Sequence, residues 1–251
     1  MSAPFAVVQD QPGSPLRRAG LTVLAWAAWP SRPATAGQDG QAVLASAAWP
    51  AETVEEPSQG LPPVAGFILS SFSPLAATVA ESCLRGYFGA PPGDPDRAAL
   101  TGIVLASDTG DIATAVHVGR AVDEGRRVPP LLFYQSNQNA ITGHIAARWG
   151  LTGPVVCTVP AADALADALD SASALIEDGD ASAALVIVVH QESVTDYQGK
   201  AGPAGPPTHE TGDHGVALLV GPRSWQPPAE PGRSGQELSG EAPTEPAPGG
   251  S

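Results

Sequence analysis

Short apolar runs of strand length alternate with amphipathic segments of helix length through most of this chain. The apolar runs predict buried strands at residues 21–29, 99–107, 155–159, 183–190 and 216–220. Helical periodicity predicts one helix that opens at Ser73-Pro74 and others at residues 112–124, 139–149 and 162–177. Strands that alternate with helices indicate an α/β sheet with crossover connections.

Two of the predicted helices carry specific expectations about capping and burial. In the first, Ser73 is a candidate N-cap with Pro74 in the first turn, and the expected buried face holds Leu75, Val79, Cys83 and Leu84. In the second, the expected inward residues are Ala115, Val118 and Val122. Residues 131–134 are expected to lead into a polar loop, and residues 42–49 fit a strand or a short helix.

The pattern divides the chain into one folded domain and two ends. Residues 1–20 are polar and contain Pro and Gly, so we expect a loose lead-in, followed by a domain at residues 21–222. Residues 30–63 are expected to be mostly loop. Residues 223–251 are rich in Pro, Gly and Glu, and this composition predicts a disordered tail.

Composition narrows the classes of partner. The 251 residues carry a formal net charge of -14, which argues against binding a nucleic-acid backbone but leaves room for a local basic patch. Two cysteines provide neither a disulfide framework nor a metal site. No apolar run reaches the roughly 18 residues of a membrane helix, and the first residues lack the pattern of a secretory signal. We therefore expect a cytoplasmic protein with no nucleic-acid or membrane partner.

Motifs for catalysis or cofactor binding are not visible. The five histidines show no H-x-x-x-H or HExxH spacing, and each is expected to be a surface or capped residue. No G-x-S-x-G elbow, G-x-G-x-x-G motif or P-loop occurs, so no cofactor or metal is predicted. Asp163 is expected to cap the helix at residues 162–177, and Cys157 is expected to be a buried structural thiol in a strand.

Several short motifs occur in a characteristic order. They are Phe72–Leu75, Ala106–Asp111, Phe133–Asn137, Ala140–Gly143, Gly153-Pro154 and Gly212–Leu218. With these motifs, residues 21–222 resemble the N-terminal half of β-ketoacyl synthases, and above all the chain length factor subunits of type II polyketide synthases. The resemblance implies an α/β fold that corresponds to the N-terminal half of a thiolase-like fold, with a mixed sheet and crossover helices.

The chain departs from that family at the catalytic nucleophile. In β-ketoacyl synthases the catalytic cysteine follows nine residues after the glycine of the Gly-Pro pair. Counting from Gly153 without a gap reaches Ala162, and the same register places the glycine that ends the helix at Gly179. The family's HGTGT-like and KxxxGH-like motifs, which supply two histidines and a lysine from the C-terminal half, do not occur. The resemblance therefore implies a subunit without a catalytic residue of its own.

What the resemblance implies is a chain length factor-like subunit that pairs with a full-length ketosynthase and meets an acyl carrier protein through that complex. The residues matched to the end of the acyl tunnel, with two neighbours, are Asn137, Gln138, Ile141, Thr142, Phe133 and Ile145. Alanines at positions 161, 162, 164, 168 and 172 predict a small-residue helix face left open for the partner. Two alternatives stay open: an acyl-processing enzyme that uses Asp163 or Cys157, and a purely structural scaffold.

Overall fold

The computed structural model describes residues 15–29, 61–191 and 213–224. The predictions made for residues 1–14, 30–60 and 225–251 lie outside the described residues. In the described ranges, no helix combines the length and the hydropathy needed to cross a membrane.

The described domain is built on one five-stranded mixed sheet. Its strands are β1 (Leu21–Trp29), β2 (Thr101–Ala106), β3 (Val155–Thr158), β4 (Ala183–His190) and β5 (His214–Pro222). They lie in the order β1-β5-β4-β2-β3, with β4, β2 and β3 parallel and β5 antiparallel to both of its neighbours. The predicted α/β sheet is thus confirmed, and crossover segments connect β2 to β3 and β3 to β4.

The central strands explain why the sequence showed continuous apolar runs. Every residue of β2 is buried, and in β4 only His190 is partly exposed. A parallel strand covered on both faces needs apolar side chains on both, so the pattern has no alternation. One boundary differs from the prediction, because Pro95–Ala99 forms the short helix α4 and β2 begins at Thr101. Asp94 caps α4 by accepting a hydrogen bond from the Arg97 amide.

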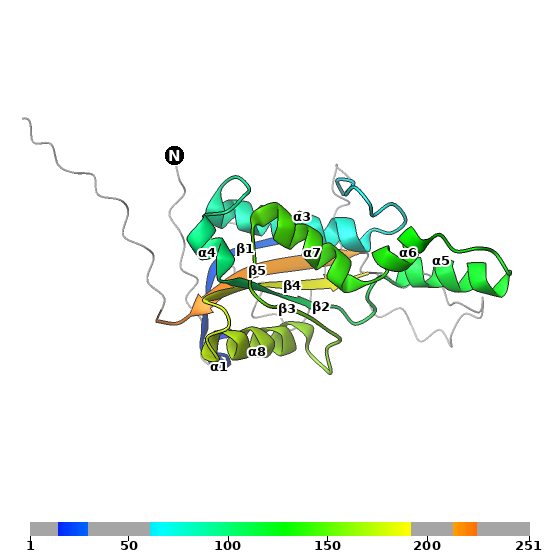
Figure 1. Cartoon of the computed structure of the whole chain (residues 1–251). Helices are drawn as coiled ribbons and strands as arrows, with labels where there is room; N and C mark the ends of the chain where they lie inside the picture. Colours follow the sequence, from blue (N-terminus) through cyan, green and yellow to red (C-terminus); the bar gives the residue numbers. More distant parts are fainter. Residues whose placement is uncertain (1–14, 30–60, 192–212, 225–251) are drawn as a thin grey trace, which may run out of the picture.

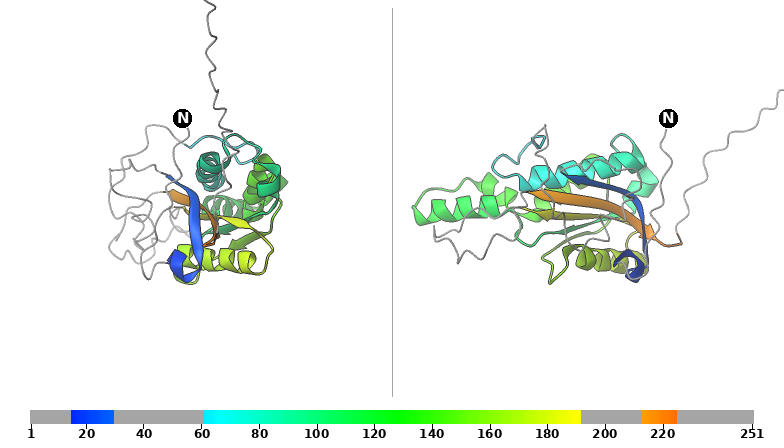
Figure 2. Two further views of the ribbon diagram at one scale, coloured as in Figure 1. Left: turned by 90° about the vertical axis from the view of Figure 1, so that its left-hand side faces the viewer. Right: turned by 180° about the vertical axis from the view of Figure 1, so that it is seen from behind.

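Helices cover both faces of the sheet. The helices α3 (Phe72–Phe88) and α7 (Gln138–Trp149) lie on one face, and α8 (Ala164–Glu177) lies on the other beside α1 (Pro15–Arg18) (Figures 1 and 2). Two apolar clusters fill the layers, one centred on Leu75, Ile141 and Leu185 and the other on Leu169, Val186 and Leu218. The sheet is therefore the middle layer of a three-layer arrangement.

The helices α5 (Ile112–Asp123) and α6 (Pro130–Gln135) extend beyond the carboxyl ends of the parallel strands (Figure 1). The predicted inward face of α5 is wrong: Ala115 is exposed, Val122 is 63% exposed, and Val118 is only partly buried. The buried residues are Thr114, Val116 and Ala121. Because α5 packs beside α6 rather than flat on the sheet, its apolar stripe does not identify its buried side.

The residues just before β1 also differ from the prediction. Residues 15–20 were expected to be loose, but α1 forms there and Leu16 is buried against α8 and β1. Backbone carbonyls secure the segment, since Ser173 Oγ donates to Ala19 at 2.6 Å and the Arg223 amide donates to Gly20 at 3.1 Å. Two buried apolar side chains, Leu16 and Ala19, and these two hydrogen bonds attach this short stretch to the domain.

The start of α3 is shifted from the predicted cap. The helix begins at Phe72, so Ser71 holds the N-cap position and makes no capping hydrogen bond. Ser73 lies in the first turn, and its buried hydroxyl has no hydrogen-bond partner in the described part of the chain. The predicted buried face is confirmed, because Leu75, Val79, Cys83 and Leu84 are at most 1% exposed.

Candidate functional site

The Gly153-Pro154 pair sets the entry to the candidate site. A Cβ on Gly153 would lie 2.6 Å from the carbonyl carbon and oxygen of Thr101, so only glycine fits this close approach of the two chains. The Pro154 carbonyl then accepts a 2.8 Å hydrogen bond from the Ile103 amide. This contact sets the parallel register of β3 on β2 and directs the following loop towards the N-terminus of α8.

At the mouth of α8, Ala162 is exposed and lies one residue before the N-cap. Asp163 caps the helix as predicted, because its Oδ1 accepts from the amides of Leu165 and Ala166 at 3.1 Å each. Asp167 adds a second carboxylate by accepting from the Ala161 amide at 2.7 Å. A thiolate nucleophile needs the positive end of a helix. Here the amides at that end are engaged by the Asp163 carboxylate, and the preceding residue, Ala162, carries only a methyl group.

The small-residue face of α8 is covered within the helix, which corrects the prediction from its alanines, whereas Ala161 and Ala162 before the helix are exposed. Ala168 and Ala172 are fully buried against the sheet and belong to its second apolar cluster. The outward side of α8 instead presents Asp170, Ala174 and Glu177. The short alanine side chains allow this helix to approach its own sheet closely, so they do not by themselves indicate a surface for a partner.

The six residues expected near an acyl tunnel fall into two groups. Ile141, Thr142 and Ile145 are 0 to 2% exposed and pack inside the described domain. Phe133 is 76% exposed, Asn137 is exposed, and Gln138 is partly buried. Of the six, the second group is the one with side chains accessible at the surface of the described domain.

Asn137 and Gln138 of the second group lie at the start of α7, next to the turn that follows β2. Asn137 caps α7 by accepting from the Asn139 amide at 2.9 Å. Gln138 lies against the turn after β2, where a Cβ on Gly110 would lie 3.0 Å from Gln138 Nε2. Gln191, at the end of β4, accepts from the Ala113 amide at 3.2 Å and donates to Ser71 Oγ at 2.9 Å. The starts of α3, α5 and α7 are thus positioned around the carboxyl ends of the strands.

An exposed apolar patch lies on α6 and the segment that packs against it. Gln135 is buried and joins the two, since its Nε2 donates to the Gly66 carbonyl and its Oε1 accepts from the Ile68 amide at 3.4 Å. The side chains of this α6 patch are 38 to 76% exposed: Ile68, Leu69, Leu131, Phe133 and Tyr134. The sequence analysis placed Leu131 and Tyr134 in a stretch that leads into a polar loop, whereas this stretch forms α6, and it did not single out Ile68 and Leu69. The Phe133–Asn137 motif was the only signal of this patch.

The two cysteines differ in accessibility but share a direction of pKa change. Cys83 is fully buried, and burial raises the pKa of its thiol to about 12. Cys157 is half-buried in β3, where burial again raises the pKa of its thiol and a hydrogen bond with Thr142 opposes the rise. Neither environment favours the thiolate that a nucleophile requires.

The described histidines do not assemble a metal site. His190 Nδ1 lies 3.2 Å from Asp108 Oδ2, and its ring stacks on His214 with centroids 4.8 Å apart. His117 and His144 lie on α5 and α7, away from this pair. Within residues 15–29, 61–191 and 213–224, no three His, Cys, Asp or Glu side chains are grouped to bind a metal ion.

Solved structures identify the fold. A ketosynthase, ApeO, in complex with its chain length factor, ApeC, from Xenorhabdus doucetiae matches with a TM-score of 0.56 and 23% identity, over 80% of this chain and 79% of that chain. The ishigamide ketosynthase/chain length factor matches with a TM-score of 0.50 and 22% identity, over 63% of this chain and 45% of that chain. The fold is therefore the N-terminal half of a thiolase-like, ketosynthase fold.

The sequence itself defines the family more closely. Residues 26–226 match the model for the N-terminal domain of β-ketoacyl synthases, and the chain belongs to that family. No curated protein matches the sequence closely enough to count as a relative.

Proposed function

We propose that this chain is a non-catalytic, chain length factor-like subunit that pairs with a full-length ketosynthase and shapes its acyl tunnel. The setting would be type II polyketide or polyene biosynthesis, with an acyl carrier protein delivering the chain through the complex. The observation that carries the proposal is the mouth of α8, where Asp163 occupies the helix end next to Ala162, the residue matched to the nucleophile by the count from Gly153. In this complex, of the acyltransferase class, the ketosynthase would perform the condensation.

The match to the Xenorhabdus doucetiae complex supports the proposal. The aligned region covers 80% of this chain and 79% of the matched chain, in a structure described as a ketosynthase in complex with its chain length factor.

The sheet edge at β3 supports a partner in a different way. β3 is the terminal strand on its side of the described sheet, and flanking side chains Val155 and Val159 are 43% and 69% exposed. An apolar edge strand is a template for pairing with another chain. Together with the α6 patch, it provides two exposed apolar features for a ketosynthase to cover.

The enzyme alternative has weaker support from the same geometry. Asp163 is engaged in the helix cap, and the raised pKa of the Cys157 thiol disfavours its reactive form. A structural scaffold and a tunnel-shaping subunit would both pair with the ketosynthase. Only the length of the products made by the complex distinguishes them.

The test is reconstitution with the ketosynthase encoded beside this chain. Each protein alone and the mixture would receive malonylated carrier protein and a starter, followed by intact-mass and product-length analysis. We expect product only from the mixture, and acylation only on the ketosynthase. A stoichiometric acyl adduct on this chain, lost in Asp163→Asn or Cys157→Ser, would establish the enzyme alternative instead.

A further inference from the structure

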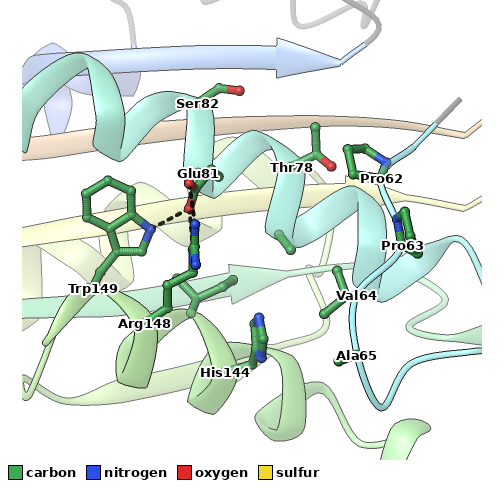
Figure 3. A pocket seen from close by; sticks show the side chains of 12 residues that line it. Pro62, Pro63, Val64, Ala65, Thr78, Glu81, Ser82, His144, Arg148 and Trp149 are labelled. Atoms are coloured by element: carbon green, nitrogen blue, oxygen red, sulfur yellow. Dashed lines mark hydrogen bonds and ion pairs between the residues drawn. The ribbon is translucent and has the colours of Figure 1, made fainter. Parts of the chain in front are cut away.

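A cavity of about 490 Å³ lies between α3, α7 and residues 62–65, on the face of the sheet opposite α8 (Figure 3). This volume falls within the range of small-molecule sites in proteins. Its apolar wall consists of Pro62, Pro63, Val64, Ala65, Ala77 and Ile145. The mouth of α8 and the α6 patch contribute no residue to it, and Ile145 is the one residue that it shares with the six expected near the acyl tunnel.

The polar side of the cavity is organised around Glu81. Its carboxylate accepts two hydrogen bonds of 2.9 Å from Arg148 and one of 2.9 Å from the Trp149 indole, and it pairs with Arg85 at 2.6 Å. Donation from Arg148, the largest contribution, together with Arg85 and Trp149 lowers the pKa of Glu81 to about 2. The carboxylate therefore stays ionised at neutral pH and holds Arg148 at the wall of the cavity.

Arg148 is the guanidinium that lines this cavity in an otherwise acidic protein. Glu81 is shared between Arg148 and Arg85, which does not line the cavity, so one carboxylate faces two guanidinium groups and does not neutralise both. The pair with Glu81 uses two of the five N–H donors of Arg148. His144 lies one helical turn before Arg148 on α7 and also lines the cavity (Figure 3).

We infer that this cavity binds a small molecule with an anionic head, a carboxylate or a phosphate, and a short apolar body. The head would bind at Arg148 and His144, because a guanidinium donates strong, charge-assisted hydrogen bonds to such oxygens. The apolar body would lie along Ala77, Ile145 and the proline wall. This binding site is independent of the proposed pairing with a ketosynthase.

The experiment uses the full-length chain labelled with ¹⁵N, with the Trp149 indole N–H resonance as the reporter. Hexanoate and n-hexyl phosphate are titrated separately, with the neutral hexanamide as the control ligand. We expect a saturable shift of the Trp149 resonance with at least one anion, at millimolar concentration or below, and a much weaker effect of the amide. The stronger of the two anions identifies the head group.

Three variants make the result specific. Arg148→Gln should weaken anion binding about tenfold or more, because it removes a charged donor. Arg126→Gln makes the same charge change beside Glu124, outside the cavity, and should leave affinity unchanged. Ala77→Leu fills the cavity without altering the ion network, so it should also weaken binding. This variant keeps the test decisive if Arg148→Gln disturbs the fold. Equal binding of hexanamide, no saturable shift, or full binding by Ala77→Leu would overturn the inference.

Discussion

Glu81 on α3 and Arg148 on α7 form a bidentate ion pair, with two N–O distances of 2.9 Å, across 67 positions of sequence. The Trp149 indole donates to the same carboxylate, so one acidic side chain ties together the two helices that cover one face of the sheet. This pair links the stability of the helical layer to the ionisation of a single group.

Stability should therefore depend on pH through Glu81. Its pKa is lowered from 4.5 to about 2 in the folded chain, so its contribution is complete above pH 4.5 and is lost as the pH falls towards 2. Glu81→Gln should lower the free energy of unfolding at pH 7 by about 1–2 kcal/mol. The variant should also lose less unfolding free energy than the original protein as the pH falls from 4.5 to 2. Urea unfolding at a series of pH values between 2 and 7 measures this difference. An identical pH dependence for the two proteins would show that Glu81 does not contribute.

Thiol labelling should be slow in the folded protein. With the pKa of Cys83 raised to about 12, only about 10⁻⁴ of it is thiolate at pH 8, and the Cys157 pKa is raised as well. We expect both cysteines to react with Ellman's reagent many-fold faster in 6 M urea than in buffer. Rapid stoichiometric labelling of native Cys157 would contradict this reading and favour the enzyme alternative.

A substitution of Phe133 should test the effect on product length without destabilising the fold, whereas a substitution of Ile141 should not. Phe133 is 76% exposed, so Phe133→Ala should change the free energy of unfolding by no more than about 0.5 kcal/mol. If Phe133 lines the partner's channel, the same variant should shift the product distribution of the reconstituted pair towards longer chains. An unchanged distribution, with the complex intact, would favour a purely structural subunit.

Ile141→Trp provides the contrasting case. Ile141 is fully buried in the core of the described domain, so a tryptophan there should overpack it and cost about 1–3 kcal/mol of unfolding free energy. We expect any effect of this variant on products to accompany loss of folded complex, measured by size-exclusion chromatography. A shorter product from a fully stable complex would show that Ile141 reaches the channel after all.

The edge of the sheet should be part of the surface for the ketosynthase. Val155→Lys combined with Val159→Lys places charge on the β3 edge and should weaken association at least about tenfold, measured by surface plasmon resonance. Val122→Lys combined with Ala174→Lys is the control with equal added charge, because both side chains are exposed, on α5 and on the outward side of α8, and neither lies on β3. Equal losses from the two changes would indicate a nonspecific effect of charge.

Most of the fold could be predicted from the sequence, and the exceptions have specific causes. The central strands β2 and β4 were visible because strands buried on both faces need continuous apolar side chains. The Asp163 cap was visible because capping depends on residues three positions apart. In contrast, the inward face of α5 was predicted wrongly, because that helix packs beside α6 beyond the sheet.

In the candidate site too, some features follow from the sequence alone and others depend on tertiary packing. The sequence by itself determined that position 162 holds a methyl group, because a register counted from Gly153 needs no three-dimensional information. Only the tertiary structure decided that Ile141 is core and Phe133 is surface, that Ala168 and Ala172 face the chain's own sheet, and that Glu81 meets Arg148. Burial and long-range ion pairs depend on which faces pack together, and local pattern does not specify that for small or isolated side chains.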